Sequence, residues 1–139
     1  MSRHELSTLA LALTLAANSA PTWAQGCVAV EVHNVQARQG HLMLSAFVDA
    51  ESFNKAPVTA IRTLATESVM KLQVCGLSGS EVALTLFQDL DSDGKLSRNL
   101  LGVPSEPWGA SGTPGFTGPQ WETSKVPLNG SAIVVRLSQ

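Results

Sequence analysis

The sequence lacks a strong excess of charge of either sign. It has nine Lys and Arg residues against eleven Asp and Glu residues, which gives a formal net charge of −2. No segment gathers basic residues into a stripe that would attract phosphate groups. On the basis of overall charge we therefore expect neither nucleic acids nor anionic membranes as partners.

Long apolar runs are absent after the first 24 residues. The N-terminal end carries Arg3, then an apolar stretch over residues 9–17, then a segment in which the small residues Thr22 and Ala24 flank Trp23. This order is typical of a cleavable signal peptide over residues 1–24. The apolar stretch is shorter than the roughly 20 residues that span a bilayer as a helix. We expect an exported, periplasmic or secreted domain over residues 25–139, with no transmembrane segment in the mature chain.

Cysteine and histidine are scarce, which limits metal and nucleophilic chemistry. Only Cys27 and Cys75 are present, and two cysteines without a nearby histidine pair do not make a zinc site. In an oxidising compartment they predict a disulfide, which would stabilise the fold by roughly 3 to 4 kcal/mol. His33 and His41 lie at outward-facing strand or turn positions. We therefore predict no catalytic residues and a protein that is not an enzyme.

Short segments of alternating apolar and polar residues dominate the expected mature chain. Such alternation, with many β-branched residues, predicts strands. The segments cover residues 27–35, 42–48, 69–77, 82–87 and 132–137, with 123–128 as a further candidate. The polar segment 36–40 ends in Gly and predicts a hairpin between the first two strands.

Two further segments do not follow the alternating pattern. Residues 58–65 are compatible with a short helix of at most two turns. In residues 102–119, nine of the eighteen positions are Gly or Pro, which excludes a regular helix or a central strand. Six or seven short strands and one long Gly/Pro-rich loop predict an all-β fold, a single small β-sandwich.

An acidic motif follows the strand predicted over residues 82–87. Asp89, Asp91 and Asp93 alternate and Gly94 comes next, as at the start of a calcium loop. In such a loop the next residue, Lys95, would offer its backbone carbonyl. The predicted metal ligands are Asp89, Asp91, Asp93 and Lys95, and calcium is the predicted ion.

The calcium motif is incomplete at its far end. Its twelfth position is Leu100, where a bidentate Glu is expected. Either another oxygen, from Ser97, Asn99 or the more distant Glu106, completes the shell, or the segment binds no calcium tightly. The alternative is a solvated Asp/Gly turn that joins two strands.

The segment from Asp89 to Pro119 resembles a known family. Its features are the acidic motif, the run Leu101-Gly102-Val103-Pro104 with Glu106, and the Gly-Phe-x-Gly-Pro segment that starts at Gly115. These residues are similar to the bacterial exported proteins of the domain of unknown function 2141 family. The resemblance implies a small periplasmic or secreted β-sandwich, prealbumin-like, with no established activity. Gln88 stands where the family pattern has His, so any role of that His is lost here.

Three aromatic residues lie in or beside the Gly/Pro-rich loop, and they are the candidate binding surface: Trp108, Phe116 and Trp121. The alternative is that they cap the open end of the sandwich. The sequence predicts a binding or structural module of the cell envelope, with an envelope component or a small ligand as partner. The alternative function is a hydrolase that uses the acidic loop near the Trp-rich loop.

Overall fold

The computed structural model describes residues 26–115 and 117–139. The predicted signal peptide and Gln25 lie outside these residues. The described chain contains eight strands and one short helix, α1 (Trp121–Ser124). The strands are β1 (Val28–His33), β2 (His41–Phe47), β3 (Thr59–Leu64), β4 (Met70–Val74), β5 (Glu81–Asp89), β6 (Trp108–Ala110), β7 (Lys125–Pro127) and β8 (Ile133–Arg136). Among the described helices, none has the length and apolar character needed to cross a membrane.

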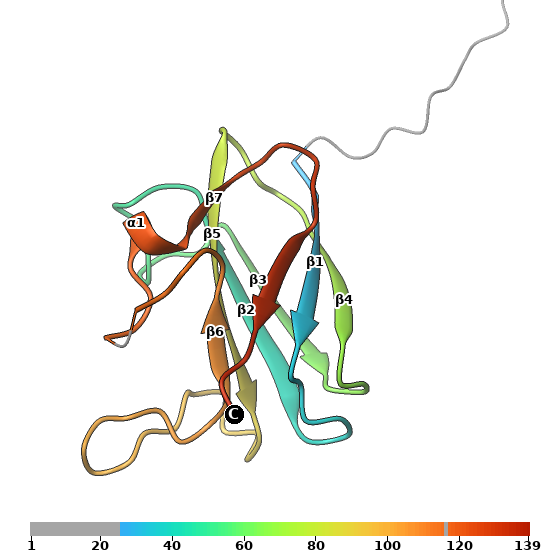
Figure 1. Ribbon diagram of the computed structural model, residues 1–139, viewed down its shortest axis with the longest axis vertical. Coiled ribbons are helices and arrows are strands. Elements are labelled where there is room, and N and C mark those ends of the chain that lie inside the picture. The colour runs from blue at the N-terminus through green and yellow to red at the C-terminus, as the bar shows by residue number, and fades with distance from the viewer. Residues whose placement is uncertain (1–25, 116) are drawn as a thin grey trace, which may run out of the picture.

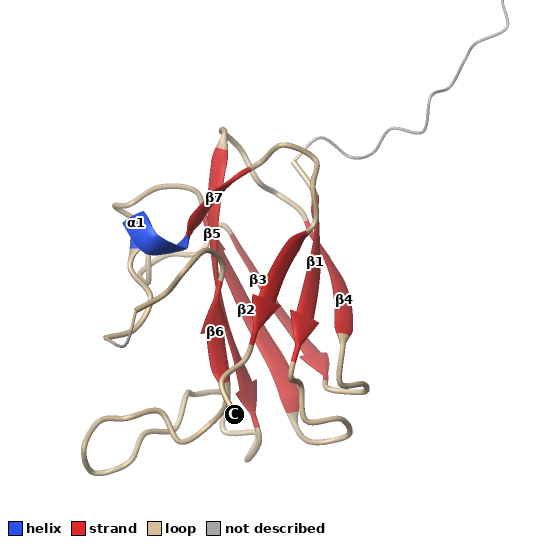
Figure 2. Cartoon of the chain, viewed as in Figure 1, coloured by secondary structure: helices blue, strands red, loops and turns tan. Residues whose placement is uncertain are grey.

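The strands form two sheets, as Figures 1 and 2 show. One sheet has the order β4-β1-β8, in which β1 and β8 run parallel. The other has the order β3-β2-β5-β6, and β7 also pairs with β5. Every strand pair except β1 and β8 is antiparallel. The predicted all-β architecture is therefore confirmed.

One apolar core receives side chains from both sheets. Alternate residues of β1, Val28, Val30 and Val32, are buried, and the same period-two pattern buries Leu42 and Leu44 of β2. Their neighbours along each strand are more exposed, because successive side chains of a strand point to opposite faces. The core thus follows directly from the alternation in the sequence.

The predicted hairpin between the first two strands is wrong. β1 and β2 lie in different sheets, so residues 36–40 carry the chain from one sheet to the other. Both edges of β1 are taken by β4 and β8, while β2 lies between β3 and β5. A short polar segment ending in Gly is compatible with a hairpin turn and with a connection between two sheets. Which of the two forms depends on the strands that pair with β1 and β2.

The predicted short helix over residues 58–65 is also wrong. Residues 59–64 form strand β3, which pairs with β2 in antiparallel register. Thr59, Ile61 and Thr63 are partly buried, and the residues between them are exposed. β-Branched side chains at every second position favour a pleated strand over a helix.

The Gly/Pro-rich segment contributes one short strand at the edge of the larger sheet. β6 has three residues and pairs with β5. A Cβ on Gly109 would lie 2.6 Å from the carbonyl oxygen of Arg136. The backbone N–H of Ser138 donates to the carbonyl of Trp108 at 2.7 Å. Glycine at this position therefore lets the end of β8 pack against β6.

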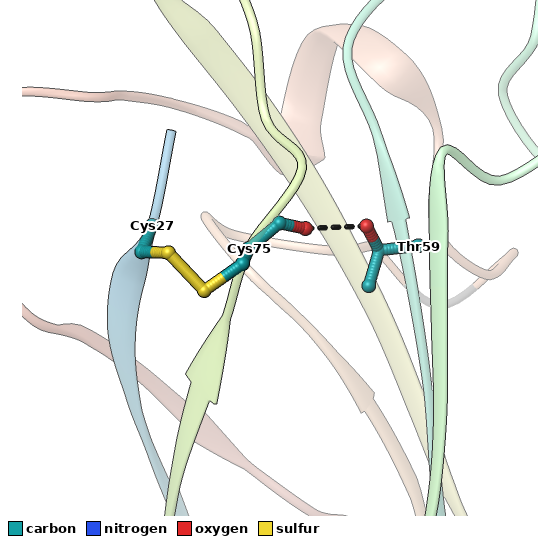
Figure 3. Close-up of a disulfide and its surroundings, with 3 residues drawn as sticks. All are labelled: Cys27, Thr59 and Cys75. Carbon is teal, nitrogen blue, oxygen red and sulfur yellow. Dashed lines mark hydrogen bonds between the residues drawn. A yellow bond between two sulfur atoms is a disulfide. The ribbon is translucent and has the colours of Figure 1, made fainter. Parts of the chain in front are cut away.

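A disulfide joins Cys27 and Cys75, as predicted, and it links the residue before β1 to the residue after β4. Figure 3 shows that the carbonyl of Cys75 also faces the other sheet, where it accepts a hydrogen bond from the hydroxyl of Thr59 at 2.5 Å. The cystine is thus close to a polar contact between the two sheets.

Candidate metal centre

The central strand β5 ends in a buried carboxylate. Asp89 is 0% exposed and lies opposite His41 in the β2–β5 register. Its Oδ2 accepts a hydrogen bond from the backbone N–H of Gly94 at 2.8 Å. Gly94 has φ of 78°, which glycine adopts without steric cost. No donor among the described residues reaches Oδ1 of Asp89.

Glu106 is a second buried carboxylate, 6% exposed, and it closes the loop from the other end. Its Oε1 accepts from the backbone N–H of Leu90 at 2.9 Å, and its Oε2 accepts from that of Ser97 at 2.9 Å. One side chain thereby ties together both ends of the acidic turn. The segment from 90 to 97 is held against the start of the Gly/Pro-rich segment.

Asp91 is exposed, and it is the third carboxylate near these two. Its Oδ1 accepts from the backbone N–H of Asp93 at 3.2 Å, and its Oδ2 accepts from the hydroxyl of Ser97 at 3.3 Å. The pKa of Asp91 is lowered from its usual value, chiefly by the hydrogen bond from the Asp93 backbone. The side chain is therefore negatively charged at neutral pH.

Asp89, Asp91 and Glu106 each offer a carboxylate oxygen, and these oxygens lie within 4.8 Å of one another. Calcium takes oxygen ligands at 2.3 to 2.6 Å, so two oxygens on one ion are at most about 5 Å apart. The cluster therefore has dimensions that suit a single calcium ion. The unpartnered Oδ1 of Asp89 is a buried acceptor that such an ion would satisfy.

The structure groups only part of the predicted ligand set. Asp89 and Asp91 come together with Glu106, one of the three residues considered for completing the shell. Asp93 is exposed and is not in this group, and its Oδ1 accepts from the backbone N–H of Lys95 at 2.9 Å. This contact makes Asp93 a turn-stabilising residue.

A groove with a volume of about 600 Å³ is lined by residues of β5, β6 and the connection between them. Phe87 and Trp108 are opposite each other in the β5–β6 register, and both line it. Arg98 and Pro104 belong to its wall, so the same loop borders the groove and the carboxylates.

The predicted aromatic surface is divided. Trp121 lies on α1 and packs edge-on against Phe53, with ring centroids 6.2 Å apart. Phe53 in turn contacts Phe47 at 5.2 Å. Trp121 therefore covers the residues after β2, while Trp108 lines the groove. Phe116 lies outside the described residues.

Both histidines of the described chain have polar neighbours. His33 Nε2 is 2.5 Å from Glu31 Oε1, and His41 Nδ1 is 3.3 Å from an Arg62 guanidinium nitrogen. Among the described residues, neither ring is hydrogen-bonded to a serine or cysteine side chain.

Gln88 is a buried polar residue whose role the sequence did not predict. It is 0% exposed. Its Nε2 donates to the carbonyls of Gln36 and Gln39, and its Oε1 accepts from the Gln36 N–H. It therefore fastens the β1–β2 connection to the strand that carries Asp89.

The fold and the cluster together define an all-β domain with a carboxylate-lined loop at the end of a central strand. A family model described as "Uncharacterized protein conserved in bacteria (DUF2141)" matches residues 30–135. The chain belongs to this bacterial family, as the resemblance predicted. No curated protein and no solved structure matches the chain.

Proposed function

We propose that this chain is an exported binding or structural module of the cell envelope, a prealbumin-like β-sandwich that binds calcium where β5 ends. The observation that carries the calcium site is the unpartnered Oδ1 of Asp89. A buried carboxylate oxygen without a donor or cation costs several kcal/mol. A calcium ion between Asp89, Asp91 and Glu106 would remove this cost.

Charge repulsion supports the same proposal. Two buried carboxylates and one exposed carboxylate offer oxygens within 4.8 Å of one another. Like charges at such distances repel strongly where water is excluded. The backbone N–H groups of Leu90, Gly94 and Ser97 offset part of this repulsion. A divalent cation would offset the rest.

The ligand chemistry favours calcium over softer metals. All three candidate side chains are carboxylates, and calcium takes six to eight oxygens in flexible geometry. Three carboxylates leave further positions for backbone carbonyls and water. We expect an affinity at the weak, extracellular end of the range, roughly 0.1 to 1 mM. Such a site fills only outside the cytoplasm, in agreement with the proposed export.

The cystine supports export, because disulfides persist in oxidising compartments. Within the described residues, the surroundings of His33 and His41 support a non-enzymatic role. The ring neighbours there are the charged groups Glu31 and Arg62, and neither ring is hydrogen-bonded to a nucleophile that a base could activate.

Titration of calcium into the chain from Gln25 onward, with the heat of binding measured by calorimetry, tests the site. Asp91→Asn and Asp93→Asn form a matched pair, since both remove one exposed charge from the same turn. In each variant the Asn side chain keeps an oxygen that can accept the backbone N–H hydrogen bond of the original Asp. We expect Asp91→Asn to weaken calcium binding about tenfold or more, and Asp93→Asn to change it only a few-fold.

The proposal would be overturned if calorimetry detected no heat of calcium binding at millimolar calcium. Equal weakening by both variants would instead favour the ligand set Asp89, Asp91, Asp93 and Lys95, with the standard loop geometry. The two variants therefore distinguish a calcium site that includes Glu106 from one formed by the ligands that the sequence motif predicts.

A further inference from the structure

The groove beside β5 and β6 lies on the face of the larger sheet that points away from the core. Leu84 and Leu86 of β5 are buried in the core, so the alternate residues Thr85 and Phe87 point to the opposite face. Both of these residues line the groove, together with Trp108 of β6. The groove volume of about 600 Å³ suits a small ligand, since such sites usually measure roughly 300 to 1,000 Å³.

Polar side chains from separate segments of the chain reach the same groove. They are Asn54 from the β2–β3 connection, Thr85 from β5, Arg98 from the β5–β6 connection and Thr117 from the segment between β6 and α1. The groove therefore combines two aromatic side chains with an amide, two hydroxyls and a guanidinium. A ligand in it would meet aromatic surface and hydrogen-bonding groups together.

The wall that the β5–β6 connection contributes has a defined shape. Arg98 and Pro104 pair through an antiparallel bridge, and both line the groove. A guanidinium nitrogen of Arg98 donates to the Gly102 carbonyl at 2.9 Å, and the Ser97 N–H donates to Glu106. The wall is thus arranged before a ligand arrives, so little order would have to be gained on binding.

The charge near the groove favours an uncharged ligand. Among the described residues that line it, only Arg98 is charged. The end of β5 and the following connection carry four carboxylates and two basic side chains: Asp89, Asp91, Asp93, Glu106, Lys95 and Arg98. One calcium ion would bring the sum of these formal charges to zero. With or without calcium the segment has no positive excess that would attract an anion.

We propose that this groove binds an uncharged saccharide, with a pyranose ring stacked on the indole of Trp108. A pyranose has apolar C–H faces and carries hydroxyls around its edge. Its faces pack on aromatic rings, while its hydroxyls exchange hydrogen bonds with amide, hydroxyl and guanidinium groups. This inference rests on the proposed function, because it names the ligand class of the binding module.

A saccharide suits this groove better than a hydrocarbon or an aromatic acid does. A hydrocarbon would cover Asn54, Thr85 and Thr117 without giving them hydrogen-bond partners, which costs free energy for each polar group that loses water. An aromatic acid would bring a negative charge to a segment without positive excess. An uncharged saccharide avoids both costs.

Calorimetric titration of the chain from Gln25 onward with cellotetraose, maltotetraose and chitotetraose tests the proposal. We expect at least one of these saccharides to bind at millimolar concentration. Trp108→Ala should weaken the binding about tenfold or more, because it removes an aromatic anchor. Trp121→Ala is the matched control and should leave the affinity unchanged, since Trp121 packs against Phe53 and is not among the residues that line the groove.

Two further variants keep the test independent of a folding defect in Trp108→Ala. Thr85→Val retains the shape of the side chain and removes one hydroxyl from the groove, so it should weaken binding about fivefold. Trp121→Phe leaves Trp108 as the only tryptophan of the chain from Gln25 onward. Saccharide binding should then change the fluorescence of Trp108.

The proposal is overturned if none of the three saccharides binds, or if folded Trp108→Ala or Thr85→Val binds as tightly as the wild type. Binding of benzoate without binding of any saccharide would identify an aromatic acid as the occupant and would overturn it as well. The heat of calcium binding is measured separately, without saccharide. If calcium binds and no saccharide does, the inference about the groove fails while the calcium site stands.

Discussion

Gln88 sits next to Asp89 along β5, and its three hydrogen bonds all reach the connection between β1 and β2. The amide is buried, so without these partners its own polar atoms would have no access to water. At the scale of single residues, the position of the candidate site therefore depends on a side chain that binds no metal itself.

Replacing Gln88 with Leu should destabilise the protein by about 1 to 3 kcal/mol, because the three hydrogen bonds between the end of β5 and the β1–β2 connection are lost. Urea unfolding followed by circular dichroism measures this. Gln73→Leu is the control, since Gln73 is exposed on β4, and it should change the free energy of unfolding by less than about 0.5 kcal/mol. Similar values for both variants would mean that the amide network contributes little.

Glu106 shows how far the candidate site could be predicted. Asp89 and Asp91 follow from the motif, because alternate carboxylates before a glycine are a local pattern. Glu106 lies fifteen residues after Asp91, outside the twelve-residue spacing of a calcium loop. The turn at residues 99–103 brings the chain back, and only the folded loop places a carboxylate oxygen of Glu106 within 4.8 Å of one from Asp91.

Strands could be predicted more reliably than their partners. The alternation along β1, β2 and β5 gave their positions, because one face of each strand enters the core. It could not assign β1 and β2 to different sheets, since a strand pattern carries no information on which edge is occupied. Over β3 the mixture of Ala, Arg and Leu with β-branched residues obscured the alternation that burial reveals.

The crossing between the two sheets requires glycine at position 40. Gly40 has φ of 60°, and a Cβ there would overlap the carbonyl oxygen of Asp89. Its own carbonyl accepts from the N–H of Ala65 at 3.1 Å. The connection thus packs directly on the end of β5, where the candidate site lies.

Gly40→Ala should destabilise the fold by about 2 to 4 kcal/mol, because it adds a backbone clash to an unfavourable φ. Gly130→Ala is the control: Gly130 has φ of 85° and open space around it, so only the conformational cost of about 1 kcal/mol applies. Thermal unfolding compares the two. Equal losses of stability would show that the clash is relieved by a shift of the backbone.

The two sheets of the whole molecule are joined along both sides. On one side, Ser138 bonds the backbone of Trp108, through both its N–H and its hydroxyl. On the other, Thr59 donates to the carbonyl of Cys75, beside the cystine. The disulfide connects residues next to β1 and β4, so it restrains the smaller sheet, β4-β1-β8.

Removal of the disulfide by Cys27→Ser with Cys75→Ser should lower the free energy of unfolding by about 4 kcal/mol, given a sequence separation of 48 residues. Scanning calorimetry should show a fall in Tm of roughly 15 °C. The wild type in reductant is the matched comparison and should unfold near the same temperature. A change of less than about 1 kcal/mol would mean that the cross-link does not restrain the unfolded chain.

The central claim is that one calcium ion lies between Asp89, Asp91 and Glu106. Anomalous scattering from crystals grown in millimolar calcium tests it most directly, because it locates the ion itself. We predict a peak within about 2.6 Å of the Asp89 Oδ1 and of oxygens from Asp91 and Glu106. A peak at Asp93 and the Lys95 carbonyl, or no peak on the loop, would contradict the account.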